Sequence, residues 1–296
     1  MLYIRHKYAK RGLQIWRSVG VQSPSEEIIP PAIACLCSLT LCEWHLGEVA
    51  SSRAAIAEAI SLAKELNNKH AVAEALSWAA GFGHAERNPA EVDRLTSDLI
   101  ELSTRHNFVY WLAQAAVLRG SARSASGKTV EGISWIEEGI RDYRATGSMI
   151  RPPYFLVLKA EALYLAHRAS EALEAIKEAE TLVERTEERC WWAELHRLRG
   201  VFLAATGADE SQIEASFCEA IRIAKEQKST SLVKRAEATQ AEYRRQRASA
   251  TGGCGFRLPL VSAELPDSSN AKHLTSQVSA VDSRDADSAS KTRPVR

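Results

Sequence analysis

The sequence contains no long run of apolar residues. A membrane-spanning helix needs about 18 or more consecutive, mostly apolar residues, and the 296-residue chain has no such stretch. The N-terminal segment MLYIRHKYAKRGLQIW is interrupted by charged side chains and lacks the apolar centre of a secretory signal. We therefore expect a cytoplasmic protein that does not bind membranes.

An excess of charge of one sign is also missing. The 38 Lys and Arg residues are balanced by 37 Asp and Glu residues, and the formal net charge is +1 at pH 7. Domains that bind nucleic acid directly carry a basic patch or a clearly positive charge. Direct binding of nucleic acid is therefore not expected.

Cysteine is too scarce, at six residues, and too irregularly spaced for a secreted disulfide framework. Cys35, Cys37 and Cys42 precede His45 on one predicted helix. A structural metal site needs four convergent ligands, and Cys37 lies on a different helix face from the other two thiols. We predict buried free thiols in this helix, no metal site and no cofactor.

No group of side chains indicates catalysis, so no enzyme activity is expected within this chain. His84, His167 and His196 have no neighbouring Ser, Cys or Asp placed for proton relay. Residues 122–129 (ARSASGKT) differ from a Walker A loop at Ala122, but such a loop follows a buried strand, and the residues before it have helical spacing. We interpret Ala122–Thr129 as a turn between helices and keep nucleotide binding as an alternative function.

What the sequence does contain is apolar residues at spacings of three and four, with only nine prolines. This periodicity predicts an all-α protein. The stretch from Trp191 to Ala224 reads as a helix, a turn at Gly207 and a returning helix. Such a hairpin cannot bury its apolar face alone and needs copies of itself to stack on.

The copies follow a period of forty residues. At the position of Gly200, where two helices cross closely, the equivalent residues are all small: Ala160, Gly120, Ala80 and Thr40. At the turn position of Gly207, the equivalent residues are His167, Gly127, Arg87 and Gly47. We predict a solenoid of antiparallel helix pairs.

The same register divides the chain. Residues 1–19 are predicted to be the second helix of a truncated repeat, and residues 32–247 the repeat array with a C-terminal capping helix. Arg235 and the other basic residues of this cap alternate with acids, which favours a solvated face. Residues 248–296 are predicted to be a disordered tail, in which the segment 256–261 (FRLPLV) could pack back onto the array.

The pattern of Gly200, Gly207, Phe217 and Ala220 resembles the tetratricopeptide repeat (TPR), although the period is longer and the usual aromatic four residues before the first glycine is missing. Residues 193–227 are similar to the last repeat in the C-terminal regions of multidomain bacterial signalling ATPases. These include proteins fused to class III adenylate/guanylate cyclase domains and maltose-activator-type regulators. The resemblance implies a right-handed superhelix that binds other molecules in signal transduction.

The first helix of each pair lines the concave groove in tetratricopeptide-like arrays, and the register gives the residues expected there. They are Trp44, Glu74, His84, Gln114, Tyr154, Glu161, Tyr164, Glu194 and Arg197. We predict a scaffold or sensor region that binds a peptide, a protein domain or a small effector there, with a cyclase or P-loop ATPase domain as one candidate partner. A non-functional gene fragment is the remaining alternative.

Overall fold

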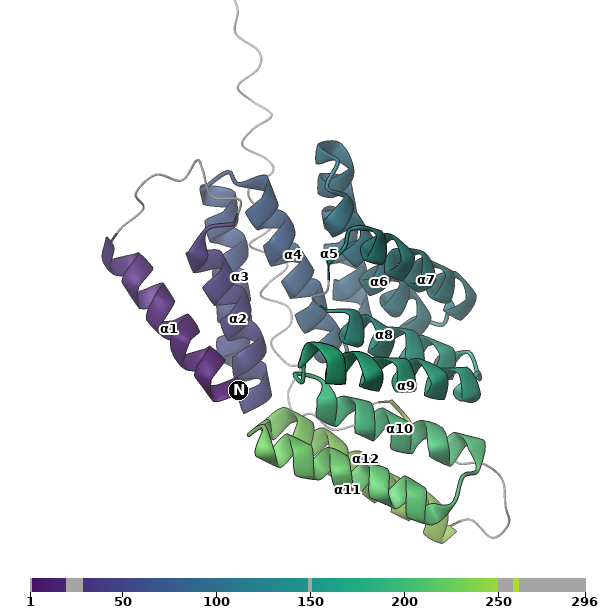
Figure 1. The fold of residues 1–296 in the computed structure, drawn as a ribbon. Coiled ribbons are helices and arrows are strands. Elements are labelled where there is room, and N and C mark those ends of the chain that lie inside the picture. Colours follow the sequence, from purple (N-terminus) through teal and green to yellow (C-terminus); the bar gives the residue numbers. More distant parts are fainter. Residues whose placement is uncertain (1, 20–28, 149–150, 250–257, 261–296) are drawn as a thin grey trace, which may run out of the picture. The chain divides into compact units, whose positions relative to one another are not determined.

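The computed structural model describes residues 2–19, 29–148, 151–249 and 258–260, and these residues are entirely helical apart from turns and short connections. The contacts of residues 1–261 make them one compact unit. Figure 1 labels the helices in chain order. They are α1 (Leu2–Val19), α2 (Pro31–Leu46), α3 (Val49–Glu65), α4 (Lys69–Ala85), α5 (Pro89–His106), α6 (Val109–Ala125), α7 (Thr129–Ala145), α8 (Pro152–Leu165), α9 (Ala169–Thr186), α10 (Trp192–Thr206), α11 (Glu210–Glu226) and α12 (Thr230–Ser249). The predicted all-α solenoid is confirmed.

The helices end at a regular interval on a residue in the left-handed backbone conformation. The predicted turn residues Gly47, Arg87, Gly127, His167 and Gly207 have φ values of 89°, 58°, 89°, 62° and 71°. The second helices of the pairs end in the same way, at Asn67, Asn107, Gly147, Glu187 and Lys228. A left-handed residue lets the last carbonyls of a helix accept hydrogen bonds from the turn. The turn predictions are confirmed, and the chain reverses about every twenty residues.

Small residues let the paired helices touch backbone to backbone. A Cβ added to Gly120 on α6 would lie 2.5 Å from the carbonyl oxygen of Gly132 on α7, and a Cβ at Gly139 would lie 2.8 Å from the carbonyl of Ala113. In the last pair, a Cβ at Gly200 would lie 2.6 Å from the ring of Phe217. Gly120 and Gly200 therefore occupy the close crossings that their sequence register predicts.

The helices form two layers along the array. The inner helices α2, α4, α6, α8, α10 and α12 each contact the next inner helix, and α12 also contacts α2. The outer helices α3, α5, α7, α9 and α11 contact only the helices adjacent to them in sequence. Figure 1 shows α11 and α12 crossing below the foot of α2. The inner helices therefore close into a ring, the inner ring, rather than leaving an open groove.

The first helix, α1, packs on α2 through the buried Ala9 and Leu13. Its other side leaves Tyr3 63%, Ile4 58% and Tyr8 70% exposed. Both a missing preceding helix and a gene fragment would leave such a surface, so both interpretations stay predictions. The helix itself lies where the sequence predicts it.

At the C-terminal end, α12 extends to Ser249, two residues beyond the predicted end of the array. Residues 258–260 are also described and pack against the inner helices. The rest of the predicted disordered tail lies outside the described residues. Among the helices that the structure describes, none has the length and apolar character needed to cross a bilayer.

Candidate functional site

The predicted groove residues all lie on inner helices, but most of them are buried rather than facing solvent. Glu74 and His84 are partly buried; the buried members are Trp44, Gln114, Tyr154, Glu161, Tyr164, Glu194 and Arg197. The expectation of one open groove therefore needs correction. The inner face is filled because α12 closes against α2 and because two further arginine side chains, from Arg87 and Arg235, enter it.

A network of buried charges occupies the centre of the inner face. Glu194 accepts hydrogen bonds from Arg197 at 2.8 and 2.9 Å and from Arg87 and Arg235 at 3.2 Å each. Glu161 accepts one from Arg87 at 2.7 Å. Ions taken out of water need such pairing, because their desolvation is expensive, and among the described residues the Nε of Arg87 is the one buried guanidinium nitrogen of the network without a hydrogen-bond partner. The network therefore fixes four helices or turns that are far apart in sequence.

The protonation states follow from these contacts. Burial alone would raise the pKa of Glu161, but Arg87 and His84 outweigh it and lower this pKa to about 2. Burial likewise opposes ionisation of Glu194, and Arg197 and Arg235 bring its pKa well below the usual range. Burial lowers the pKa of Arg235 to about 10, so its guanidinium stays charged at neutral pH. Arg235 thus lies in the buried network, and the prediction that its side chain faces solvent is wrong.

A hydrogen-bonded chain leads outward from this network. Burial lowers the pKa of His84, so its imidazole is neutral at pH 7. The Nε2–H of His84 donates to Glu161 over 2.7 Å, which leaves Nδ1 to accept from the hydroxyl of Tyr154 over 3.0 Å. Tyr154 therefore connects the ionic network to the hollow that its ring helps to line.

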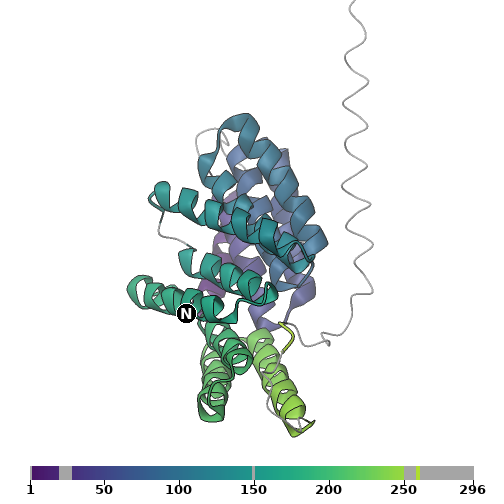
Figure 2. The ribbon, with the colours of Figure 1, turned by 90° about the vertical axis from the view of Figure 1, so that its right-hand side faces the viewer.

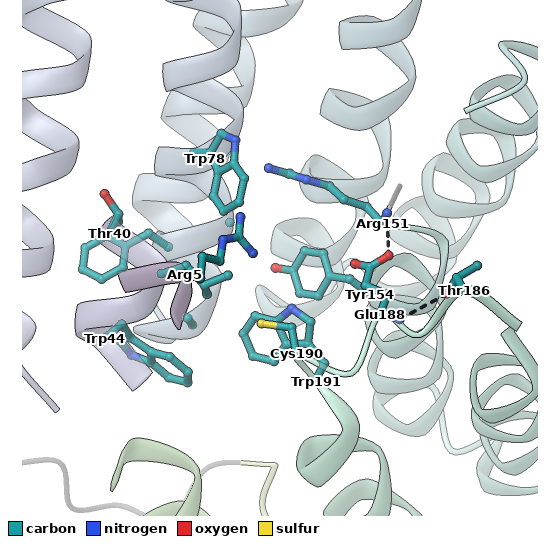
Figure 3. A pocket seen from close by; sticks show the side chains of 14 residues that line it. Arg5, Thr40, Trp44, Trp78, Arg151, Tyr154, Thr186, Glu188, Cys190 and Trp191 are labelled. Carbon is teal, nitrogen blue, oxygen red and sulfur yellow. Dashed lines mark hydrogen bonds between the residues drawn. The ribbon is translucent and has the colours of Figure 1, made fainter. Parts of the chain in front are cut away.

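That hollow, the aromatic pocket, is built from the rings of Trp44, Trp78, Phe82, Tyr154 and Trp191 and has a volume of about 310 Å³. Tyr154 and Trp191 stack with centroids 5.0 Å apart, and Trp44 lies 5.7 Å from Trp191. Figure 3 shows the rings of Trp44, Trp78, Tyr154 and Trp191 around the same space; Trp44 comes from α2, Trp78 from α4 and Tyr154 from α8, and Trp191 directly precedes α10. The pocket therefore offers flat, apolar walls of a size that suits one small ligand.

Two guanidinium groups reach into the aromatic pocket. Arg151 lies over the ring of Trp78 at 4.4 Å from the centroid, and Arg5 lies 5.6 Å from the same centroid (Figure 3). Among the described residues, neither side chain has a carboxylate within ion-pair distance. Glu188 also lines the pocket, but it accepts the backbone N–H of Arg151, and burial raises its pKa. The pocket is therefore electropositive.

A second hollow, the tail cleft, lies between the α4–α5 turn, α6 and α8 and is closed on one side by Leu258, Pro259 and Leu260. Its volume is about 540 Å³, and it shares no lining residue with the aromatic pocket. His84, Glu161 and Tyr164, three of the predicted groove residues, line it. The predicted groove is thus divided into two hollows on either side of the ionic network.

His45 joins residues that the sequence separates widely. Its Nδ1 lies 2.7 Å from the hydroxyl of Ser229, and its Nε2 lies 3.4 Å from the sulfur of Cys190. This resembles a nucleophile beside a base, which sequence reasoning missed. However, burial raises the pKa of Cys190 to about 12 and lowers that of His45 to about 3. The proton therefore stays on sulfur at neutral pH, and the cluster connects α2 to α12 rather than activating a thiolate.

The Walker-A-like stretch forms an ordinary helix connection. Residues 109–125 before it are a helix, not a strand. The amide of Gly127 donates to the carbonyl of Ser124, and the amide of Lys128 donates to that of Arg123. A phosphate cradle needs these amides to point into an empty loop. The nucleotide-binding alternative is therefore dropped.

The cysteine-bearing helix is α2, with Cys37 and Cys42 buried and Cys35 partly buried. Burial raises the pKa of each of the three thiols. The fourth residue of the sequence cluster, His45, is directed at Ser229 and Cys190 instead. Among the described residues no group of His, Cys, Asp or Glu side chains has the geometry to hold a metal ion.

Comparison with known proteins agrees with a helical-repeat fold. A family model for anaphase-promoting complex subunit 5 matches residues 32–86 and 192–247, which span α2–α4 at one end of the array and α10–α12 at the other. A Rhizobium meliloti (strain 1021) protein described as uncharacterized is 26% identical over 204 residues, or 69% of this chain. The match covers 20% of that protein, so the chain spans about a fifth of its length.

Among solved structures, the apo form of RapI is similar, with a TM-score of 0.52 and 11% sequence identity. The superposition covers 84% of this chain and 99% of RapI. At this identity the likeness shows the fold alone. The chain therefore has a helical-repeat fold similar to that of RapI.

Proposed function

We propose that the chain is a ligand-sensing scaffold and that its ligand binds in the aromatic pocket. The ligand has a planar apolar body and one anionic group. A small effector has this chemistry, and so does the C-terminal residue of a peptide that ends in an aromatic side chain. The proposal depends chiefly on one observation: two guanidiniums without a carboxylate partner face a box of aromatic rings.

Each part of the pocket supports this ligand chemistry. Flat rings such as those of Tyr154 and Trp191 favour a planar body that stacks on them. Guanidinium groups bind carboxylate and phosphate by charge-assisted, often bidentate, hydrogen bonds. An anionic ligand would therefore bind more tightly beside Arg5 and Arg151 than a neutral ligand of the same shape, and a cationic ligand would be repelled.

The position of the pocket supports a sensing role. One wall comes from α1, α2 and α4, and the opposite wall comes from α8 and the segment that leads into α10. A ligand between these two walls contacts inner helices from the start and from the later part of the chain at once. A ligand shifts a conformational equilibrium only by its difference in affinity for the two states. Binding here would favour the closed ring over any state in which α12 and α2 separate.

The finer proposal is that this scaffold acts on a cyclase or P-loop ATPase domain in signal transduction. Its support is the sequence resemblance to such C-terminal regions and the length of the Rhizobium meliloti relative, of which this chain matches 20%. Reading the upstream coding sequence in frame tests it. A cyclase or P-loop domain there is the expected result, and its absence would refute this link without touching the pocket.

The ligand chemistry is tested by calorimetric titration with three probes that share one ring. Indole-3-acetate, indole and tryptamine differ mainly in carrying a negative, no or a positive charge. We expect affinity to fall in that order. A hydrogen bond to a charged group contributes about 1.5–3 kcal/mol. Arg151→Gln should therefore reduce the affinity for indole-3-acetate by about 10- to 100-fold and leave the affinity for indole nearly unchanged.

Arg141→Gln is the matched control, because Arg141 is exposed on α7 and does not line the pocket. A peptide source is separated from a small effector by titrating glycyl-tryptophan against its C-terminal amide. If all three indole probes bound equally, or none bound to a folded chain, the proposed ligand class would be wrong.

A further inference from the structure

Three residues of the C-terminal segment are seated on the inner helices outside the repeat pattern. Leu258 is fully buried, Pro259 is exposed and Leu260 is partly buried, with Leu258 and Leu260 packed against the hydrophobic core. Figure 2 shows them as a short yellow-green piece beside the array. Side chains that alternate inward and outward are typical of an extended peptide. The segment is thus placed as a bound peptide would be.

The cleft also holds the main chain of this segment. The hydroxyl of Tyr164, on α8, donates to the carbonyl oxygen of Leu258 over 2.8 Å. Tyr164 is itself buried, and its ring lies 5.1 Å from that of Phe202. A backbone carbonyl is present in every peptide, so this contact fixes an extended chain while the apolar pockets select its side chains.

The cleft is larger than the segment that closes it. The space beside Leu258–Leu260 has a volume of about 540 Å³. Val92, Ala122 and Leu165 give it apolar walls, and His84, Arg87 and Glu161 lie at its polar end. A longer peptide could therefore occupy the cleft without movement of the surrounding helices.

We propose that the tail cleft is a peptide-binding site for an extended apolar–Pro–apolar sequence and that Leu258–Leu260 is its internal ligand. An external peptide of the same chemistry competes with this segment for the cleft. The site is separate from the aromatic pocket and does not depend on the ligand proposed there.

The internal ligand is held chiefly by its attachment to α12. One buried leucine, one partly buried leucine and one hydrogen bond are few contacts for ordering three residues, which lose backbone and side-chain entropy. Only residues 250–257 separate the segment from the end of α12, and a short tether gives an effective concentration in the millimolar range. If the segment and an external peptide both have an intrinsic dissociation constant of about 100 µM, the attached segment would raise the apparent dissociation constant of the external peptide about tenfold or more.

The test uses full-length chains and a fluorescent peptide with the sequence of residues 256–261 (FRLPLV), followed by anisotropy. Leu258→Asp places a charge in the apolar cleft and should release the segment. We expect this variant to bind the peptide saturably, at least tenfold more tightly than the unmodified chain. Adding Tyr164→Phe should weaken that binding by about fivefold, through loss of one hydrogen bond.

Arg141→Gln is the matched control, because Arg141 is exposed on α7 and does not line the tail cleft; the affinity of this variant for the peptide should equal that of the unmodified chain. A peptide with Asp in place of its first leucine should bind none of the chains. Thermal unfolding checks that each variant is folded, and Leu258→Ala provides a milder release should Leu258→Asp fail to fold.

Absence of saturable binding to a folded released variant at 1 mM peptide would overturn the proposal. Equal binding to the released and unmodified chains would overturn it as well, because the segment would then not compete. Indole-3-acetate titration of the same variants should be unchanged, since the two hollows share no residue. Failure of one proposal is thereby distinguished from failure of the other.

Discussion

The α6–α7 hairpin and the inner ring are held together by contacts of opposite kinds. In the hairpin, Gly120 and Gly132 bring two backbones together across a turn of a few residues. In the ring, Arg87 pairs with Glu161 across 74 positions in the sequence and with Glu194 across 107. The hairpin is held by local contacts that require small residues at the helix crossing. The ring is held by ion pairs between residues far apart in the sequence.

This difference shows where each region is vulnerable. The hairpin has almost no free volume at its crossing, so an added methyl group has nowhere to go. The ring tolerates small changes of volume at its two hollows but cannot leave an ion unpaired in its interior. Its closure also orders long stretches of chain, which costs loop entropy before the contacts form.

Neutralising the centre of the ring should give the largest effect. Glu194→Gln keeps the shape of the side chain but leaves Arg87, Arg197 and Arg235 with one carboxylate, Glu161, among them. Breaking a buried ion pair costs about 3–5 kcal/mol, because the remaining charge stays desolvated. Urea-induced unfolding followed by circular dichroism should show a loss of this size.

Glu101→Gln is the corresponding change outside the ring. Glu101 pairs with Arg105 four residues away on α5, and both side chains are about two-thirds exposed or more. Such pairs contribute little, so less than about 0.5 kcal/mol should be lost. Equal losses from the two variants would mean that the buried network does not stabilise the ring.

Filling the hairpin crossing should come second. Gly120→Ala would put a Cβ 2.5 Å from the carbonyl oxygen of Gly132 and 2.9 Å from the backbone nitrogen of Ile136. Backbone atoms cannot move aside cheaply, so the overpacking should outweigh the better helix propensity of alanine, for a net loss of about 2 kcal/mol. Thermal unfolding measures the change.

Gly81→Ala tests the same substitution where there is room. Gly81 lies within α4, and a Cβ there would meet only the hydroxyl of Tyr154 at 3.9 Å. Alanine should therefore stabilise this helix by about 0.5–1 kcal/mol. If Gly120→Ala were also stabilising, the two helices would not be held at the separation described above.

The two regions also differ in how far the sequence predicts them. The period of forty identified Gly120, Gly200 and the left-handed turn residues, because local packing and backbone conformation restrict which residue types fit. It placed Trp44, Tyr154 and Tyr164 on the inner face for the same reason. Local periodicity therefore carries the information for the hairpins and for the orientation of each helix.

The ring could not be predicted in the same way. Arg87 was recognised only as a turn residue and Arg235 as part of a solvated face, since nothing in the spacing indicates that α12 returns to α2. Arg5 and Arg151, which give the aromatic pocket its charge, lie 146 positions apart in the sequence. Which surface a long-range contact covers is decided by the small rotation between successive pairs, and one sequence does not reveal that rotation.

Acid should weaken the ring selectively, and this is the smallest of the three effects near neutral pH. His45, near the C-terminal end of α2, is buried against Ser229 and faces Trp44, Trp191 and Cys190. Its burial, together with the positive charges of Arg235 and Arg5, lowers its pKa from 6.5 to about 3. The unfolded chain therefore takes up a proton below pH 6.5 that the folded chain refuses. The contribution of His45 to stability is therefore present above pH 6.5 and is lost as the pH drops toward 3.

The loss from His45 alone should reach about 2 kcal/mol at pH 5, because each pH unit in this window corresponds to 1.36 kcal/mol. His84, whose pKa is also lowered by burial, adds to the slope in the same direction. His45→Gln should flatten the dependence between pH 7.5 and 5 while His84→Gln removes only its own part. Amide hydrogen exchange localises the effect: opening should increase at α2 and α12 as the pH falls and stay constant in α6 and α7, where no titrating histidine lies. Uniform opening of both regions would show that the ring and the hairpin unfold as one unit rather than as the two separable kinds of contact described for them.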